Sequence, residues 1–70
     1  MSEKSIEVTI NGQSVLCRPG SLLDYILAAG LDPQTVVVEV NRRILEAGEA
    51  GGYQLNAGDQ IEIIQFVGGG

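Results

Sequence analysis

Hydrophobic and polar residues alternate along the first part of the chain. In Ser5–Ile10 every second residue, beginning with Ile6, is apolar and β-branched, and Glu7 and Thr9 lie between them. This period of two predicts a strand with one buried face. Asn11-Gly12 follows, a pair typical of a type I′ hairpin turn, because both central residues of that turn need positive φ.

The residues after this turn, Gln13–Arg18, are expected to form the returning strand of the hairpin. A two-residue turn fixes the register of the two strands, and the hydrophobic pattern agrees with that register. The predicted cross-strand pairs are Val8 with Val15 and Ile6 with Cys17 on the core side, and Thr9 with Ser14 and Glu7 with Leu16 on the outer side.

A short amphipathic helix is expected after Pro19-Gly20 breaks the second strand. Ser21 is a good N-cap, and Asp24 three residues later suits a weak capping box and places a negative charge near the helix N-terminus. Gly30 suits the positive φ that ends a helix, so the predicted helix is Leu22–Ala29. Its apolar stripe at helical spacing consists of Leu22, Leu23, Ile26 and Leu27.

The second half of the chain predicts further strands and one loop. Val36–Asn41 holds a run of valines that favours an interior strand. Ile44-Leu45 is expected to add a brief strand, and Gln60–Val67 is the last one. Glu46–Gly52, which holds three glycines, is expected to have no regular structure.

This order of elements predicts an α+β fold, in which a mixed sheet of four or five strands carries one main helix on one face. The 70 residues allow one domain, which we place at residues 1–67, with a flexible glycine tail at 68–70. Because 44% of the residues are hydrophobic, we expect a packed core rather than disorder.

The composition also excludes several kinds of chemistry. With no His and one Cys, the chain offers no ordinary structural zinc site, internal disulfide or His-activated nucleophile. Four Lys and Arg against nine Asp and Glu give a net charge of −5, which disfavours nucleic-acid binding and favours partners with basic surfaces. No apolar run could span a membrane and no signal peptide is evident, so we expect a cytoplasmic monomer without bound cofactors.

The last strand and the tail are the candidate functional features. Ile61 and Ile63 suit the helix-covered face, which leaves Ile64 and Phe66 on a face that should be polar. Scattered surface apolar residues are normal, but a pair next to a glycine tail indicates a docking patch. The predicted docking surface consists of Ile64, Phe66, Val67, Leu16 and Val37, and the predicted tail of Gly68, Gly69 and Gly70.

Two interpretations of the three glycines remain open at this point. They could be a frayed terminus, because glycine gains little from packing and loses much backbone entropy on ordering. Alternatively, a bare end could present the α-carboxylate of Gly70 to the active site of another protein, at a reach of about 10 Å for three extended residues.

Other polar residues have simpler interpretations. Cys17 lies on the core face of the hairpin, where a free Cys acts as a small hydrophobe. Glu46 and Glu49 could imitate an acid–base pair but lie in a glycine-rich loop, which favours solvated charges. Asp59 is expected to bond to the backbone of its turn. Arg42-Arg43 is too short for a nucleic-acid patch and could contribute a contact at the rim of an interface.

Several segments together resemble the ThiS family of bacterial sulfur carriers in thiamine biosynthesis. These are Asn11-Gly12, the helix after Pro19-Gly20, Val38–Asn41 and, most specifically, Gly58–Gly70. The resemblance covers essentially the whole chain and implies a β-grasp, ubiquitin-like fold that ends in Gly-Gly. The small subunit of molybdopterin synthase is similar in kind, but we would expect a proline before its tail, which Gln65–Val67 lacks.

The resemblance implies a carrier rather than an enzyme. A ThiF-type adenylyltransferase would activate the carboxylate of Gly70 with ATP and magnesium, and a sulfur-relay protein would supply sulfur from a cysteine persulfide to give a thiocarboxylate. A thiazole synthase of the ThiG type would then take this sulfur into the thiazole ring. The alternatives are a carrier of the molybdopterin-synthase type, an interaction-only module and a protein modifier.

Overall fold

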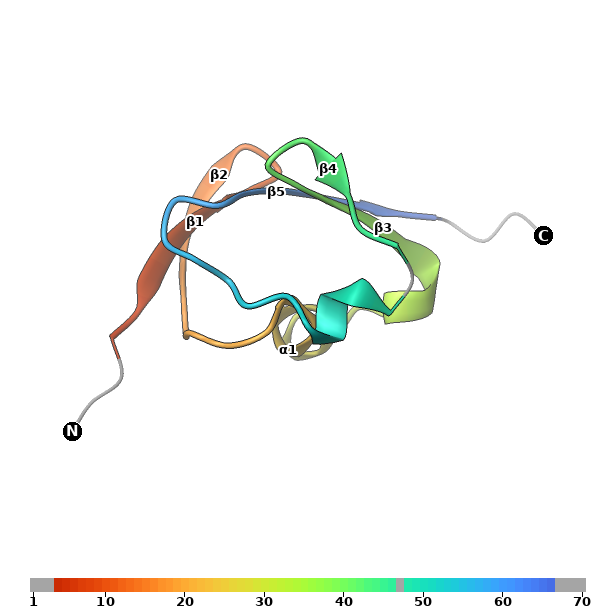
Figure 1. Ribbon diagram of the computed structural model, residues 1–70, viewed down its shortest axis with the longest axis horizontal. Coiled ribbons are helices and arrows are strands. Elements are labelled where there is room, and N and C mark those ends of the chain that lie inside the picture. Colours follow the sequence, from red (N-terminus) through yellow and green to blue (C-terminus); the bar gives the residue numbers. More distant parts are fainter. Residues whose placement is uncertain (1–3, 47, 67–70) are drawn as a thin grey trace.

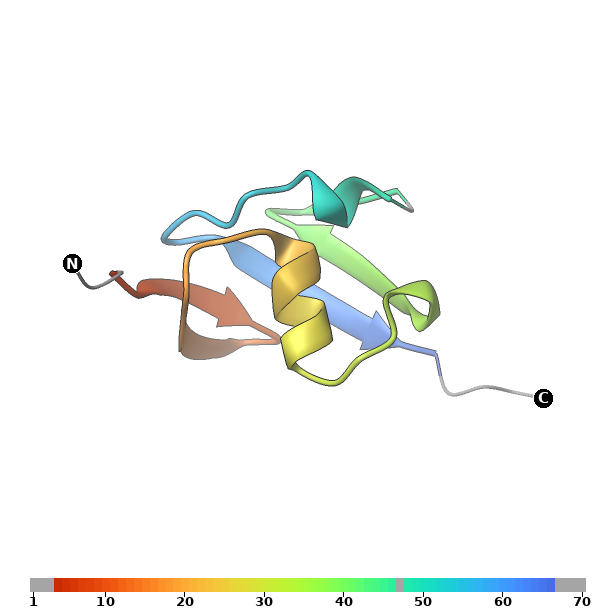
Figure 2. The same cartoon turned by 90° about the horizontal axis from the view of Figure 1, so that it is seen from below.

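The structure is a computed structural model, and it describes residues 4–46 and 48–66. One sheet contains strands β1 to β5 in the order β2-β1-β5-β3-β4, and the helix α1 (Leu22–Ala28) packs against one of its faces (Figure 1 and Figure 2). β1 and β5 are parallel and the other neighbours are antiparallel, so the predicted mixed α+β sheet is confirmed. The strands are β1 (Ile6–Ile10), β2 (Gln13–Cys17), β3 (Val36–Val40), β4 (Arg43–Ile44) and β5 (Gln60–Gln65).

The N-terminal hairpin has the predicted turn and the predicted register. Asn11 and Gly12 have φ values of 51° and 84°, as a type I′ turn requires. All the predicted cross-strand pairs occur, including Ile6 with Cys17. β1 begins one residue after its predicted start, and β2 ends one residue before its predicted end, because Ser5 and Arg18 are not part of the ladder.

The helix begins at the predicted N-cap. The Ser21 Oγ accepts a hydrogen bond of 3.0 Å from the Asp24 N–H, and Gly30 follows the helix with a φ of 80°. Leu22 and Ile26 are buried, but Leu27 is 55% exposed, so its place in the apolar stripe was predicted wrongly. Each residue advances about 100° around a helix, which turns Leu27 away from the sheet once Leu22 and Ile26 face it.

Two short 3₁₀ helices were not predicted. η1 (Pro33–Thr35) precedes β3, and its N-cap Asp32 accepts a side-chain hydrogen bond from the Gln34 N–H. η2 (Glu49–Gly51) lies inside the segment that we expected to be irregular. Hydrogen bonds between backbone groups three residues apart tighten the chain there into a 3₁₀ turn. β3 ends at Val40 rather than at the predicted Asn41, because Asn41 has a φ of 51° in the turn to β4.

The core lies between the sheet, α1 and the segment that joins β4 to β5. Its described residues, 45–46 and 48–59, which we call the strap, pass beside α1 and close that side of the core (Figure 2). In the described part of the chain, no helix covers the opposite face of the sheet, which therefore faces outward (Figure 1). The buried core residues are Val8, Ile10, Leu22, Ile26, Val38, Val40, Leu45, Leu55 and Ile61.

Candidate functional site

The outward face of the sheet carries exposed apolar side chains near the end of β5. Ile64 and Phe66 are 58% and 63% exposed, as predicted for the face opposite α1. Val37 of β3 lies directly opposite Ile64 and is half-buried. The Phe66 N–H donates a 2.9 Å hydrogen bond to the Thr35 carbonyl, so the β3–β5 pairing continues to the last described residue.

Ile44 belongs to the same surface and was missed from the sequence. It is 60% exposed and pairs with Glu39 on the outward face of β3. The signal was present in the alternation, because Leu45 next to it is buried in the core. We call this surface the outer apolar patch, and it consists of Val37, Ile44, Ile64 and Phe66.

Leu16 does not enlarge this patch, contrary to our prediction. Leu16 is 71% exposed and pairs with Glu7 of β1. Glu7 lies two residues before Thr9, and Thr9 pairs with Gln60 at the start of β5. With the rise and spacing of β-strands, Leu16 lies about 20 Å along the strands and about 10 Å across them from Ile64. The two exposed residues therefore belong to opposite ends of the outward face.

The remaining predicted site residues are Val67, Gly68, Gly69 and Gly70, and they lie outside the described residues. Their functional roles therefore stay predictions. The described chain reaches Phe66, one residue after the central strand β5 (Figure 1). The described chain therefore ends in the outer apolar patch, of which Phe66 is a member.

A buried carboxylate fixes the turn that begins β5. Asp59 is 6% exposed, and its Oδ2 accepts hydrogen bonds of 2.8 Å from the Tyr53 hydroxyl and the Asn56 N–H. Its Oδ1 accepts a 3.0 Å bond from the Asn41 Nδ2. Burial alone would raise the pKa of Asp59, but the hydrogen bonds from Asn56, Asn41 and Tyr53 outweigh burial and hold the pKa below its usual 3.8. The predicted turn role of Asp59 is confirmed.

Two asparagine side chains hold β5 in place from both sides. The Asn11 Oδ1 accepts a 2.8 Å bond from the Ile63 N–H, and the Asn11 Nδ2 donates to the Ile63 carbonyl at 3.3 Å. On the other side the Asn41 Oδ1 accepts a 2.9 Å bond from the Gln60 N–H. These amides continue the backbone ladders where the neighbouring strands turn away, and they fix the strand that presents the outer apolar patch.

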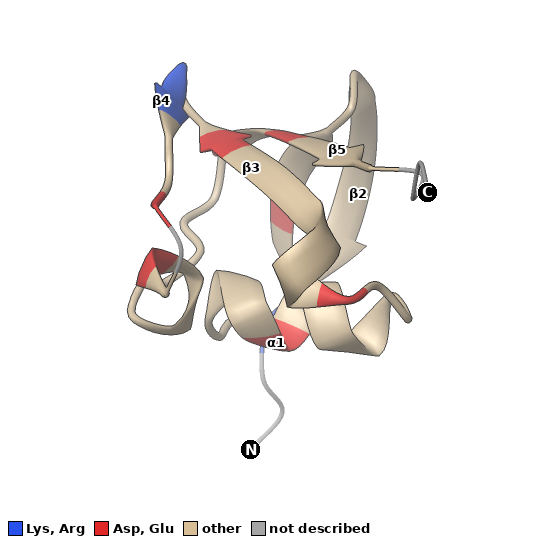
Figure 3. Ribbon diagram, turned by 90° about the vertical axis from the view of Figure 1, so that its right-hand side faces the viewer, with Lys and Arg blue, Asp and Glu red and all other residues tan. Residues whose placement is uncertain are grey.

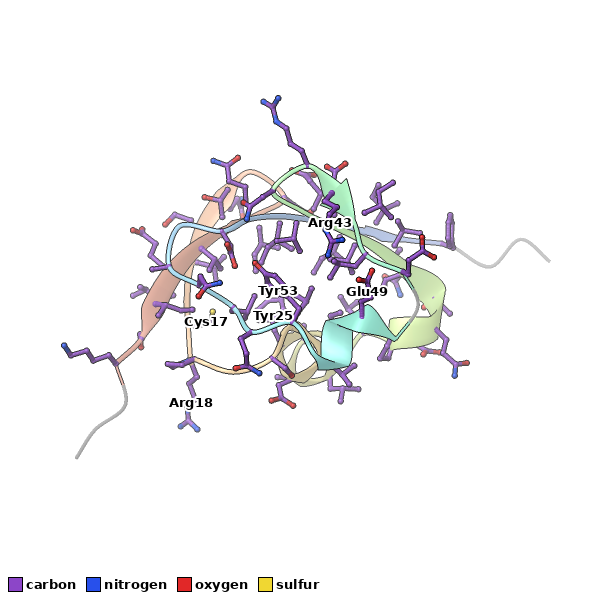
Figure 4. All side chains as sticks on the ribbon, viewed as in Figure 1. Cys17, Arg18, Tyr25, Arg43, Glu49 and Tyr53 are labelled. Carbon is purple, nitrogen blue, oxygen red and sulfur yellow. The ribbon has the colours of Figure 1, made fainter. Side chains whose placement is uncertain are left out.

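Cys17 and the loop glutamates have no arrangement suited to catalysis. Cys17 packs against the core, as predicted, and burial raises the pKa of its thiol, which disfavours the reactive thiolate (Figure 4). The Glu49 carboxylate accepts from the Glu46 N–H and lies 3.5 Å from the Arg43 guanidinium, so Glu49 is paired rather than merely solvated (Figure 4). Arg43 is therefore engaged with the strap.

Residues 4–46 and 48–66 contain neither a candidate metal site nor a candidate membrane-spanning helix. No group of three or more His, Cys, Asp or Glu side chains there could hold a metal ion. No helix in the same part of the chain is long and apolar enough to cross a lipid bilayer.

Comparison with known proteins decides the family. The model of the ThiS family matches residues 3–70. The chain belongs to the ThiS family. A crystal structure of the thiamine biosynthesis protein ThiS from Geobacter metallireducens superposes with a TM-score of 0.76 at 25% identity, over 93% of this chain and all of that one. An NMR structure of a thiamine biosynthesis protein from the same organism gives a TM-score of 0.76 at 26% identity, over 93% of this chain and 88% of that one.

These structures place the fold in the β-grasp class expected for the ThiS family. A further relative is a thiazole synthase from Magnetococcus marinus, which is 33% identical over 66 residues. The match covers 93% of this chain but 20% of the relative, so the chain spans about one fifth of the length of that protein.

Proposed function

We propose that this chain is a sulfur carrier of thiamine biosynthesis, in which the C-terminal carboxylate of Gly70 is converted to a thiocarboxylate. The observation that carries the proposal is the ThiS-family match, which extends through residue 70 and so includes the three glycines. The two solved thiamine biosynthesis proteins with the same fold support the same pathway. On this proposal the chain is a substrate of other enzymes and has no active site of its own.

The chemistry requires activation by a partner. A carboxylate is a poor electrophile, because a negative oxygen is a poor leaving group. Attack of the Gly70 carboxylate on the α-phosphorus of ATP would release pyrophosphate and give an acyl-adenylate. A persulfide sulfur would then attack the acyl carbon, AMP would leave, and reduction of the resulting disulfide by a thiol would yield the thiocarboxylate. Magnesium and the cations for the phosphate charges would come from a ThiF-type adenylyltransferase.

The outer apolar patch is the docking surface in this proposal. Three of its four side chains are exposed, and it lies on the face of the sheet opposite α1. It includes the last described residue, Phe66, which lies three residues before Gly69. Glycine at the terminus minimises steric hindrance at the acyl carbon. A partner that binds the patch could therefore receive the C-terminus in its own active site while the folded body stays outside.

A thiazole synthase of the ThiG type is the proposed acceptor of the sulfur. The Magnetococcus marinus thiazole synthase contains a segment similar to almost the whole of this chain within a polypeptide about five times as long. When a carrier-like segment is part of the synthase polypeptide, the segment is present at a high effective concentration near the rest of the synthase. This favours direct transfer of sulfur from the segment to the synthase. For this chain we propose the same transfer of sulfur to a thiazole synthase.

Pyrophosphate release tests the proposal directly. The adenylyltransferase of the source organism, with ATP and magnesium, should release pyrophosphate when the full chain is added. A chain without Gly69 and Gly70 should give no release, while its urea midpoint stays unchanged. If the shortened chain supports the same release, the terminal carboxylate of Gly70 is not the reacting group and the proposal is wrong.

A further inference from the structure

Two glutamates face each other on the outward face of the sheet, next to side chains of the outer apolar patch. Glu39 of β3 pairs with Glu62 of β5, and Ile44 of β4 pairs with Glu39 from the other side. Figure 3 shows an acidic segment, in red, on each of the neighbouring strands β3 and β5. Two residues further along the same two strands, Val37 and Ile64 form the next pair on this face.

The backbone bonds set how close the two glutamates are. The Asn41 N–H donates to the Gln60 carbonyl and the Phe66 N–H to the Thr35 carbonyl, at 2.8 Å and 2.9 Å. Hydrogen-bonded pairs alternate along an antiparallel ladder, so Glu39 and Glu62 also form such a pair, with Cα atoms about 5.5 Å apart. Their side chains leave the same face of the sheet side by side.

This arrangement is unfavourable in the isolated chain. Like charges directly opposite each other destabilise a pair of strands, and a neutral polar residue would serve equally well at the half-buried position 39 and the exposed position 62. Among residues 4–46 and 48–66, no ion pair includes Glu39 or Glu62. The Arg43 side chain, on the neighbouring strand, is paired with Glu49 on the opposite side of the sheet (Figure 4).

We infer that Glu39 and Glu62 together receive an arginine side chain of the protein that docks on the outer apolar patch. A guanidinium is planar, has donors that can bond two carboxylates at once, and is weakly hydrated, so it can lie against apolar neighbours. Ile44 lies beside Glu39 on β4, and Ile64 lies two residues after Glu62 on the same face of β5, so both supply such neighbours. The net charge of −5 agrees with a basic partner surface.

A protein cation fits this surface better than a metal ion does. Two carboxylates give too few oxygen ligands for calcium, and the adjacent side chains of Val37, Ile44 and Ile64 offer none. The inference rests on the proposed function, because it assigns specificity to the docking step by which the adenylyltransferase would bind the carrier. The pair acts in recognition and takes no part in the chemistry at Gly70.

Opposite effects on stability and on binding provide the test. Glu62→Gln keeps the shape of the side chain and removes one charge, so the thermal midpoint of the free chain should stay equal or rise. Its affinity for the adenylyltransferase, measured by calorimetry at low salt, should fall about tenfold, and the loss should shrink as salt is added. The matched control is Glu46→Gln, which makes the same change of net charge in the strap and should bind like the parent chain.

Each other result decides against the inference. Equal affinity of Glu62→Gln and Glu46→Gln would show that the pair contacts no cation and would leave the proposed function intact. A lower thermal midpoint for Glu62→Gln together with weaker binding would show a structural role instead. If the parent chain does not bind the adenylyltransferase, the proposed function and this inference both fail.

Discussion

Replacing Asp59 by Asn tests the account of how β5 is held in place. Asp59 joins the strap to the turn after β3, through Tyr53 and Asn56 on one oxygen and Asn41 on the other. The amide oxygen of an Asn at position 59 can keep the bonds from Tyr53 and Asn56. Its amide nitrogen would then face the Asn41 Nδ2. Both groups are hydrogen-bond donors, so the hydrogen bond that the Asn41 Nδ2 donates to the Asp59 carboxylate would be lost.

Asn41 cannot resolve this conflict by turning its own amide. Its Oδ1 accepts from the Gln60 N–H at 2.9 Å, and a flip would lose that bond. Asp59→Asn therefore removes one charge-assisted hydrogen bond and weakens two others, which should cost about 2 kcal/mol. A domain of this size has a net stability of about 3–5 kcal/mol, so the loss is a large fraction of the total.

Urea unfolding followed by circular dichroism measures this loss. With a slope of about 1 kcal/mol per molar urea for a small domain, the midpoint should fall by about 2 M. Tyr53→Phe is the matched control, because it removes one donor and leaves the other two, and its midpoint should fall by less. An unchanged midpoint for Asp59→Asn would refute the assigned role of the carboxylate.

The pH dependence gives an independent check of the same bonds. Because the pKa of Asp59 in the folded chain lies below its usual 3.8, the unfolded chain binds this proton first as the pH falls. The stability that Asp59 contributes is therefore fully present above that value and is lost as the pH drops through the lower folded pKa. The difference in unfolding free energy between the parent and Asp59→Asn should shrink over this range, and a constant difference would contradict the reasoning.

Three further predictions concern the hairpin and two glycines. Asn11→Ala should cost about 1–2 kcal/mol in urea unfolding, because it removes two bonds to the Ile63 backbone and places Ala at a φ of 51°; equal stability would contradict this. Cys17 should react with a thiol reagent more slowly in the native chain than in the denatured chain, and equal rates would refute its packing against the core. Gly58→Ala, at a φ of 89°, should lower stability by about 1 kcal/mol, whereas Gly51→Ala, where φ is not positive, should be tolerated; equal losses would contradict the backbone argument.

Local sequence signals were enough to predict the hairpin and the helix start. Asn11-Gly12 specifies its turn through the positive φ of both residues, and the turn then fixes every pair of the hairpin. Ser21 caps α1 through a bond to a residue three positions away. The exposure of Ile64 and Phe66 also followed from the period of two in one strand. Each of these features depends on neighbours in the sequence.

The features that the sequence did not predict depend on contacts between distant segments. The Asp59 network joins side chains from the β3–β4 turn and the strap, and no local pattern specifies which donors a buried carboxylate will meet. The separation of Leu16 from Ile64 follows from the parallel pairing of β1 with β5, which the hairpin register alone cannot give. The same holds for the Glu39–Glu62 pair, since the order of strands decides which residues become opposite neighbours.

Intact-mass spectrometry of the full chain tests the central proposal most directly. The chain is incubated with ATP, magnesium, the adenylyltransferase and a sulfur source, and the terminal peptide is then sequenced by fragmentation. The account predicts a gain of about 16 Da, from replacement of one oxygen by sulfur, confined to Gly70 and dependent on ATP. An unchanged mass under conditions in which the enzyme is active, or a gain located at Cys17, would contradict it.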